Sequence, residues 1–273
     1  MSDPTLTRSS VDGVTLLRDE NVPCGVTLAF TERTGGVSEG GFSSLNLGDA
    51  CGDDPGHVLE NRRRALAALG CGDLVDELVN PKQVHGDRVV VIDAGGEVAA
   101  AARAEAREGA DAVVCTVADV PVLLCYADCV PVILVAPGGF AVVHSGWRGT
   151  IARISGKAAR ILVDVAGSST REVSAYVGPH VGAADYEVSQ ELLDRFVAEF
   201  GDGVRGGGRC LDLGFAVRAA LEDAGVPSRS IVDCGISTVR ATDRFYSYRA
   251  SGGVCGRHGA IACMRSAGDV TAR

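Results

Sequence analysis

The sequence is poor in aromatic residues, proline and histidine. Phe, Trp and Tyr make up 5% of the 273 residues, and there are nine prolines, five histidines and two methionines. Scarce proline and 46% hydrophobic residues exclude a disordered or low-complexity chain. A chain of this length can bury a sizeable core without disulfides or a structural metal, as one large domain or two small ones.

The chain also has no excess of positive charge. The chain has 26 Lys and Arg against 35 Asp and Glu, which gives a net charge of −9. Nucleic acids and anionic membrane surfaces bind basic faces of proteins, so neither is expected as a main partner. A small-molecule substrate fits this charge balance better.

Long apolar runs are absent as well. Residues 1–20 mix charged and apolar residues, unlike a signal sequence. The longest apolar run, 121–137, contains Asp128 and Pro131 and is too broken to cross a bilayer. The ten cysteines include no C-x-x-C pair, which favours reduced thiols. We therefore expect a cytoplasmic protein that does not bind membranes.

Hydrophobic periodicity predicts interleaved helices and strands. Helices are expected at 54–70, 150–167, 189–200 and 213–224, and strands at 26–30, 89–92, 112–115, 122–125, 132–135, 140–144, 173–177 and 231–236. They do not alternate strictly, which favours a single α+β domain over 1–273, with mixed β-sheets flanked by helices. Within it we expect a peripheral segment at 1–23 and a solvated helix or surface insertion at 94–109.

One stretch, YADCVPVIL at residues 126–134, places Asp128 and Cys129 inside an apolar run. A buried carboxylate without a partner is costly, so a compensating feature is expected there. Cys129 follows an apolar strand and precedes Val130 and Pro131, where the chain must turn or run along a sheet edge. The stretch is therefore interpreted as two strand segments that meet at a polar break.

Two histidines have a setting similar to that of Cys129. His85 lies in a turn before a Val-rich strand, and His144 ends a strand before the glycine-containing turn SGWRGT. Taken singly, His85 could be an ordinary turn histidine, and Cys129 could be a buried structural thiol. Together the three form a Cys/His/His set, the composition of a catalytic zinc site with one open position. Their separations match no compact metal motif, so the interpretation depends on their contexts.

Several short motifs resemble one family in the order in which they occur. They are RTGGVS with SLNLG, KQVHG, DAVVCT, YADCVPVIL, VVHSGWRGT, GPHVG with YEV, and YSYR with GR. Across nearly the whole chain they are similar to the YfiH family. That family has been described as polyphenol oxidase or laccase-like, and as purine nucleoside phosphorylase with adenosine deaminase activity.

The resemblance implies an α+β fold with mixed sheets and a metal site. The matching ligand positions are His85, Cys129 and His144, and the metal implied is zinc, with copper also possible. The implied substrates are purine nucleosides and phosphate. Zinc can lower the pKa of a bound water from about 15.7 to roughly 7. The resulting hydroxide would be available at neutral pH to attack C6 of adenine.

Further residues are candidates for substrate contacts. Arg33 in RTGGVS and Arg148 in the turn before a helix are candidates for phosphate, with a structural ion pair as the alternative for Arg148. Asn46 in SLNLG is a candidate for base or ribose, or a structural turn residue. His180 in GPHVG either approaches the cleft or is a satisfied turn histidine.

Asp128 is the candidate for proton transfer. The zinc nucleobase deaminases carry an H-x-E and P-C-x-x-C signature that this sequence lacks, so another group must move the proton. The alternative role for Asp128 is that of a residue that orients a metal ligand.

Three other functions remain open. A multicopper laccase would need more than five histidines, and Met264 is not in a blue-copper motif, although a single-copper polyphenol oxidase remains an alternative. A metal-independent cysteine hydrolase would use Cys129 as nucleophile with His144 or His85 as base. A nucleoside-binding protein without turnover is the third. The oligomeric state and the physiological nucleoside are left open.

Overall fold

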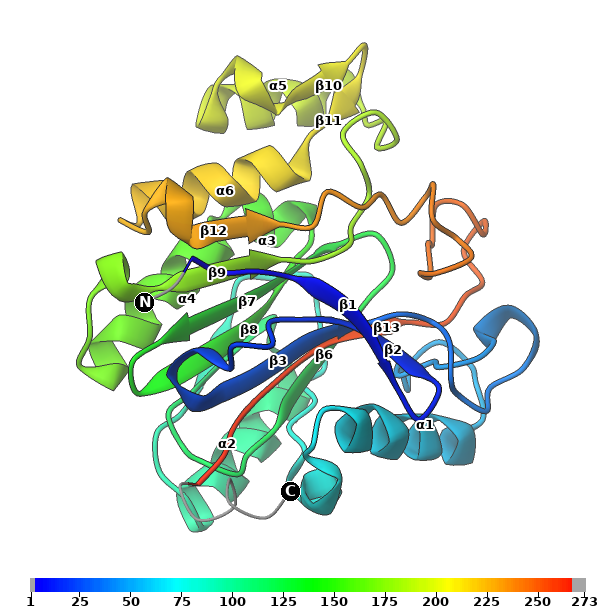
Figure 1. The fold of residues 1–273 in the computed structure, drawn as a ribbon. Helices are drawn as coiled ribbons and strands as arrows, with labels where there is room; N and C mark the ends of the chain where they lie inside the picture. Colours follow the sequence, from blue (N-terminus) through cyan, green and yellow to red (C-terminus); the bar gives the residue numbers. More distant parts are fainter. Residues whose placement is uncertain (1–2, 267–273) are drawn as a thin grey trace.

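Two β-sheets form the centre of the protein (Figure 1). The computed structural model describes residues 3–266. One sheet contains, in spatial order, β1 (Thr7–Val11), β2 (Val14–Arg18), β3 (Val26–Thr31), β13 (His258–Met264) and β6 (Val122–Tyr126). The other contains β12 (Ile231–Asp233), β9 (Ser174–Val177), β7 (Val130–Ala136), β8 (Gly139–Ser145), β5 (Ala112–Cys115) and β4 (Val89–Ile92).

Both faces of the central strands are buried, which explains their continuous apolar runs. On β7, Ile133 and Val135 belong to the cluster between the two sheets, together with Leu124 of β6. The alternate residues of β7, such as Val132, belong to the cluster on the outer face of the six-stranded sheet. A third cluster, which includes Leu123 of β6, lies on the outer face of the five-stranded sheet.

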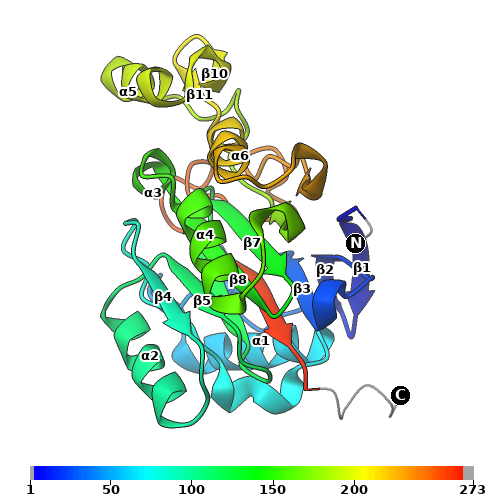
Figure 2. The same ribbon diagram turned by 90° about the vertical axis from the view of Figure 1, so that its left-hand side faces the viewer.

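Helices cover the two outer faces (Figure 2). α1 (Pro55–Ala68) packs against the five-stranded sheet, and α4 (Ile154–Ala166) and α6 (Leu213–Asp223) pack against the six-stranded sheet. α2 (Glu97–Glu108) lies beside β4, and the short α3 (Trp147–Ile151) precedes α4. α5 (Gln190–Phe200) and the hairpin of β10 (Arg205–Gly207) and β11 (Cys210–Leu211) project at one end.

The predicted α+β class with mixed sheets is confirmed. The pairs β4 with β5 and β9 with β12 are parallel, whereas the other pairs of the two large sheets are antiparallel. β4 and β5 have the predicted bounds, and the helices predicted at 189–200 and 213–224 appear as α5 and α6. Asp54 caps α1 as its position before Pro55 indicates, because its carboxylate accepts from the amides of Gly56 and His57.

Other predictions differ from the structure. The helix expected at 150–167 begins earlier and is interrupted, because Arg153 has a left-handed φ of 58° between α3 and α4. The segment expected to be peripheral contributes β1 and β2, and Leu16 within it is fully buried. The helix predicted as one alternative for 94–109 is confirmed as α2, most of whose residues are exposed, whereas Ala102 and Ala106 are buried in the core. β13 was not predicted, and residues 1–2 and 267–273 of the expected domain lie outside the described residues.

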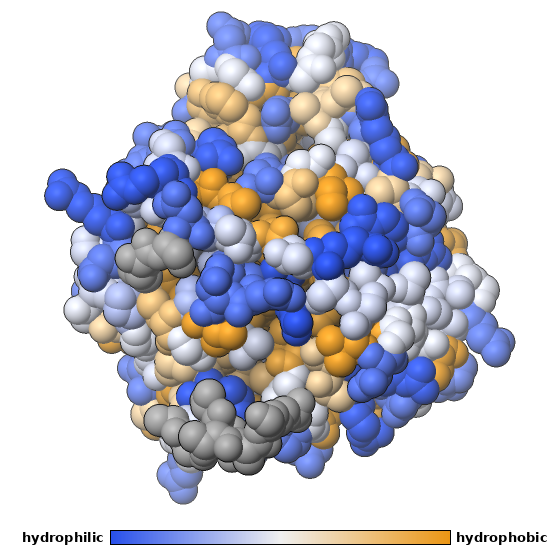
Figure 3. Space-filling model, viewed as in Figure 1, coloured by the Kyte–Doolittle hydropathy of each residue, from blue (hydrophilic) through white to orange (hydrophobic). Residues whose placement is uncertain are grey.

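The surface shows no broad apolar area in the view of Figure 3. Hydrophilic residues cover much of that face, with apolar residues in small groups between them. Large exposed hydrophobic residues occur singly along the described chain: Val22, Leu59, Val84, Val98, Phe215, Tyr248 and Val254. Among residues 3–266, the structure contains no helix that is both long and apolar enough to cross a membrane.

Candidate metal and substrate site

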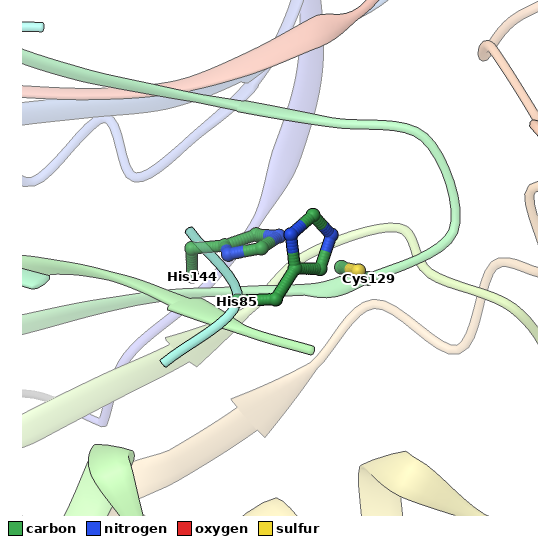
Figure 4. A group of neighbouring side chains, drawn as sticks. All are labelled: His85, Cys129 and His144. Atoms are coloured by element: carbon green, nitrogen blue, oxygen red, sulfur yellow. The ribbon is translucent and has the colours of Figure 1, made fainter. Parts of the chain in front are cut away.

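Three side chains from distant parts of the sequence converge at the junction of the two sheets (Figure 4). His85 lies in the turn before β4, Cys129 precedes β7, and His144 lies on β8. Their donor atoms all lie within 4.8 Å of one another. The two imidazole rings meet edge to face, with centroids 4.8 Å apart. We call these residues the triad.

Cys129 reaches the triad because the chain crosses between the sheets at Ala127–Cys129. β6 belongs to one sheet and β7 to the other, so the apolar run breaks where the chain changes layer. Asp128 occupies this break with a φ of 90°. Its Oδ1 accepts from the Thr238 hydroxyl at 2.6 Å, and its Oδ2 accepts from the Arg249 amide at 2.7 Å. Asp128 thus connects the triad to residues 238–249.

Asp111 positions both histidines of the triad. It precedes β5, which pairs with β8, and the amide of His144 donates to the Asp111 carbonyl at 2.7 Å. The carboxylate is fully buried, and its Oδ1 lies 2.7 Å from Nδ1 of His144. It also accepts from the amides of His85 at 2.9 Å and Gly86 at 2.7 Å. These bonds hold the turn in which His85 has a φ of 58°.

Gly146 leaves the space that the triad occupies. A Cβ atom at this position would lie 3.1 Å from Cδ2 of His85 and 3.3 Å from Sγ of Cys129. Gly149 allows a second close approach, because its Cβ would lie 2.7 Å from the carbonyl oxygen of Gly86. The glycines of SGWRGT therefore let α3 begin directly against the triad.

The triad and Asp111 form a charged network when no metal is bound. Burial raises the pKa of the Cys129 thiol, but the neighbouring His144 and His85 outweigh it and lower the pKa to about 6. Burial lowers the pKa of His144, but Cys129 and Asp111 outweigh it and raise the pKa to about 9. Burial also raises the pKa of Asp111, and its bond to His144 reverses the shift, so that the pKa lies below its usual value.

The donor set of the triad fits a transition metal. One thiolate and two imidazoles are the ligands that zinc and copper prefer, and three protein ligands leave a position for water or substrate. The Asp111 contact at Nδ1 of His144 leaves the other ring nitrogen for a metal, the arrangement common in metal-binding histidines. Within residues 3–266 this is the single group of His, Cys, Asp or Glu whose donor atoms converge in this way.

The triad opens into a cavity of about 970 Å³. This volume is at the upper end of the roughly 300–1,000 Å³ that is typical of small-molecule sites. Its wall contains the aromatic residues Tyr126, Trp147, Tyr186 and Tyr248, the basic residues Lys82, Arg107, Arg249 and Arg257, and the acidic residues Asp49 and Asp128. The cavity therefore offers ring surfaces and positive charge beside the triad.

The structure brings the expected metal ligands together but places the expected substrate contacts elsewhere. The guanidinium of Arg33 donates to the carbonyls of Ser43 and Thr242 and does not line the cavity. Arg148 stacks on Trp147, 4.5 Å from the ring centroid, and is not part of the wall.

Asn46 has a structural position, the alternative considered for it. It is fully buried, its Nδ2 donates to Asp53, and its Oδ1 accepts from the amides of Gly48 and Arg257. His180 is also buried, with Nδ1 2.8 Å from the carbonyl of Gly178, and lies outside the cavity wall.

Several residues of the site escaped the sequence analysis. Asp111, Lys82, Arg249 and Arg257 stand in the motifs DAVVCT, KQVHG, YSYR and GR, but nothing in their local sequence distinguishes them from surface residues. Gln83 was also missed: its side chain donates to the Cys125 carbonyl at 2.7 Å and accepts from the Cys125 amide at 2.8 Å.

Known proteins resemble this chain over nearly its full length. The family described as multi-copper polyphenol oxidoreductase laccase matches residues 27–265. A protein of Deinococcus radiodurans named purine nucleoside phosphorylase is 38% identical over 255 residues, which cover 91% of this chain and 92% of that protein.

Solved structures share the fold. The structure of YlmD from Geobacillus stearothermophilus has a TM-score of 0.83 and 29% identity, and the match covers 96% of this chain and 100% of YlmD. A Bacillus licheniformis protein named YfiH also has a TM-score of 0.83, with 28% identity over 94% of this chain and 98% of that one. The chain therefore belongs to the YfiH family, the family described as multi-copper polyphenol oxidoreductase laccase.

Proposed function

We propose that this protein is a metal-dependent purine nucleoside phosphorylase that also deaminates adenosine. In the first reaction, adenosine or inosine and phosphate give the free base and ribose 1-phosphate. The observation that carries the proposal is the triad inside a cavity that combines aromatic rings with basic side chains. The Deinococcus radiodurans relative, which is named purine nucleoside phosphorylase, supports it. We further expect the protein to act in the cytoplasm.

We propose zinc as the metal, with copper as the alternative. Both His85 and His144 offer an imidazole beside the Cys129 thiolate, which suits either ion. When bound, zinc would supply Lewis acidity and an activated water molecule. Asp111 would fix the orientation of the His144 ring and hold the turn that carries His85.

The cavity wall would position the nucleoside. Tyr186 and Trp147 line the cavity and would contact the purine. The side-chain amide of Gln83 is held by the backbone of Cys125. Phosphorolysis forms a bond between a phosphate oxygen and C1′ of ribose. The bond between C1′ and the purine nitrogen breaks, and its electron pair leaves with the base. The wall would hold these groups in the orientation that the reaction needs.

We assign Asp128 an anchoring role rather than proton transfer. Both of its carboxylate oxygens accept short hydrogen bonds, from Thr238 and from the Arg249 amide. Both oxygens therefore already have partners within the chain. Asp128 would instead hold residues 238–249 against the turn that carries Cys129.

A cysteine hydrolase is the second candidate, because the metal-free triad pairs a thiolate with an imidazolium. Cys129 has a pKa of about 6 and His144 a pKa of about 9, as a nucleophile and its acid–base partner require. Alkylation of Cys129 that abolishes the activity of a metal-free preparation would favour this candidate. Metal that is required for turnover would favour the phosphorylase.

The family description leaves a copper-dependent polyphenol oxidase as a third candidate. The triad provides ligands for one metal ion, and no other such ligand group converges in the described part of the chain. A single-copper oxidase would therefore be expected rather than a multicopper laccase. Oxidation of phenols by copper-loaded protein, without nucleoside turnover, would support this candidate.

The proposal is tested with protein purified without added metal. Adenosine, inosine and guanosine are each incubated with and without phosphate, and free base, ribose 1-phosphate and deaminated nucleoside are measured by chromatography. We expect phosphate-dependent release of base and ribose 1-phosphate, and inosine formation from adenosine. If nucleosides bind without any turnover under zinc or copper loading, the protein is a binding protein and the proposal is wrong.

A further inference from the structure

Three basic side chains that line the cavity are linked to one another through neighbouring residues. They are Lys82, Arg107 and Arg257, which we call the basic arc. In a chain with a net charge of −9, the cavity wall contains four Lys or Arg and two Asp. The local charge therefore opposes that of the whole protein, and a function of the cavity would explain it.

Contacts through neighbouring residues link the three members of the basic arc. The amide of Lys82 donates to the Ala106 carbonyl at 3.0 Å, so that Lys82 lies beside the end of α2, which carries Arg107. Arg107 reaches across to Asp49, with Nη1 3.3 Å from Oδ2. The next residue back, Gly48, lies so close to Arg257 that a Cβ atom on it would be 2.7 Å from Cγ of Arg257.

The acidic residues of the wall make their hydrogen bonds and ion pairs with groups other than Lys82 and Arg257. Asp49 pairs with Arg62 at 3.2 Å as well as with Arg107. Asp128 accepts bonds from Thr238 and from the amide of Arg249, and neither partner belongs to the basic arc. Neither carboxylate forms an ion pair with Lys82 or Arg257.

Arg257 is held in place by hydrogen bonds to the backbone, and two of its guanidinium nitrogens have no hydrogen-bond partner in residues 3–266. Its amide donates to Asn46 at 2.8 Å, and its Nη1 donates to the carbonyls of Cys255 and Gly256. Its Nε and Nη2, and the ammonium group of Lys82, make no hydrogen bond or ion pair with any residue in 3–266. Two adjacent guanidinium donors that are already oriented suit a tetrahedral oxyanion, which arginine can bind through two parallel bonds.

We propose that the basic arc is a binding subsite for a phosphoryl group, beside the triad in the same cavity. The inference deepens the proposed phosphorolysis, on which it rests for its biological role, by naming the residues that take the phosphate. Two ligands carry the same chemistry: inorganic phosphate, and the phosphate ester of a nucleotide. Lys82 and Arg257 supply direct contacts, and Arg107 adds positive charge while it holds Asp49.

Binding of the two ligands is measured by calorimetry with the metal-loaded protein. Inorganic phosphate is titrated alone, and adenosine is compared with adenosine 5′-monophosphate. The variants are Lys82→Gln, whose side chain has no partner to lose, and Arg257→Gln. Arg63→Gln is the matched control, because it removes the same charge from an exposed position on α1 outside the cavity. Melting temperatures show whether each variant is folded.

Each of the two cavity variants should weaken phosphoryl binding about tenfold or more, since one charge-assisted contact is lost. Adenosine binding and the Arg63→Gln protein should be unchanged. A loss for inorganic phosphate identifies the free anion as the ligand, whereas a loss for the monophosphate alone identifies the ester. Wild-type affinity for both ligands in Lys82→Gln and Arg257→Gln overturns the proposal, as does the absence of binding by the wild type.

The titrations measure binding without turnover, so the phosphoryl subsite and the phosphorylase function can be refuted independently of each other. Phosphate binding that depends on Lys82, without any ribose 1-phosphate formation, would contradict the phosphorylase and leave the subsite intact. Cys129→Ala removes a triad ligand and should retain phosphate binding at the basic arc. Loss of phosphate binding in Cys129→Ala with normal binding in Lys82→Gln would place the anion at the triad instead and refute the subsite.

Discussion

Asp111 Oδ1 lies 2.7 Å from Nδ1 of His144, and the same carboxylate accepts from the backbone amides of the turn that carries His85. A single buried side chain thus orients one histidine directly and the other through its backbone. Metal-binding histidines commonly have such a partner, and its removal weakens metal binding although no ligand is lost.

Asp111→Asn should lower metal affinity by about 10–100-fold, because the His144 ring and the turn of His85 lose their charged acceptor. The side-chain NH2 of the new asparagine would also face the backbone N–H groups of His85 and Gly86, which are donors themselves. The free energy of unfolding should therefore fall by about 1.5–3 kcal/mol. Chelator competition measures the affinity, and urea unfolding measures the stability. Asp93→Asn, an exposed site after β4, is the control. Unchanged metal affinity in Asp111→Asn would show that Asp111 does not position the histidine ligands.

Gly146→Ala should loosen the triad without removing a ligand. The backbone at Gly146 has φ −73° and ψ 170°, which alanine adopts freely, so the effect comes from the added methyl group. Overpacking against His85 and Cys129 should cost about 1–3 kcal/mol, which corresponds to a loss of roughly 5–150-fold in metal affinity. Gly95→Ala, where a Cβ meets nothing within 4 Å, should bind metal normally. Equal affinities in the two variants would contradict the packing described.

Cys129 should be alkylated at unusually low pH once the metal is stripped. Its pKa of about 6 means that the thiolate predominates at pH 7 and is lost as the pH falls through 6. Cys125 lines the same cavity, but burial raises its pKa to about 11, so it should stay unmodified at pH 7. Peptide mapping after iodoacetamide treatment from pH 5 to 9 follows both thiols. An alkylation midpoint near the ordinary cysteine pKa of about 8.5 would refute the charged network.

Asp128→Asn tests anchoring against proton transfer. If Asp128 anchors residues 238–249, the variant should lose about 1–3 kcal/mol of unfolding free energy, because its amide group opposes the amide of Arg249. Thr238→Val removes the other partner and should lose stability in the same way. A proton-transfer role predicts instead that deamination falls by about 100-fold or more in Asp128→Asn and stays normal in Thr238→Val. Unfolding curves and kinetics of both variants separate the two roles.

The parts of the fold that follow from local pattern were predictable. β4 and β5 are continuous apolar runs, whereas α5 and α6 have apolar residues at helical spacing after the caps Ser189 and Asp212, and the predicted positions of all four agree with the structure. β13 was missed although it is central to the five-stranded sheet, because its sequence HGAIACM contains small residues that fit between two neighbouring strands. The interruption at Arg153 was also missed, since its side chain is held there by Glu199 and Asp223 from other helices.

For the site, the sequence indicated the triad but not its surroundings. His85, Cys129 and His144 stand at strand ends with turn residues beside them, which made them candidates as a set, and the resemblance to the YfiH family implied the same three positions. The role of Asp111 depends on the register between β5 and β8, which no local pattern contains. The sequence also did not predict the different positions of Arg33 and Arg257, because both look like exposed basic residues. Tertiary contacts hold Arg33 against backbone carbonyls, whereas Arg257 lines the cavity.

The central claim is that a metal held by the triad is required for nucleoside turnover. The most direct measurement is metal content together with phosphorolysis, for the wild type, Cys129→Ala and Cys125→Ala, all purified without added metal. Cys125 lines the cavity outside the triad and serves as the matched control. We predict about one metal ion per chain and full activity in the wild type and Cys125→Ala, with both lost in Cys129→Ala. Phosphorolysis by metal-free wild type, or metal and activity retained in Cys129→Ala, would contradict the account.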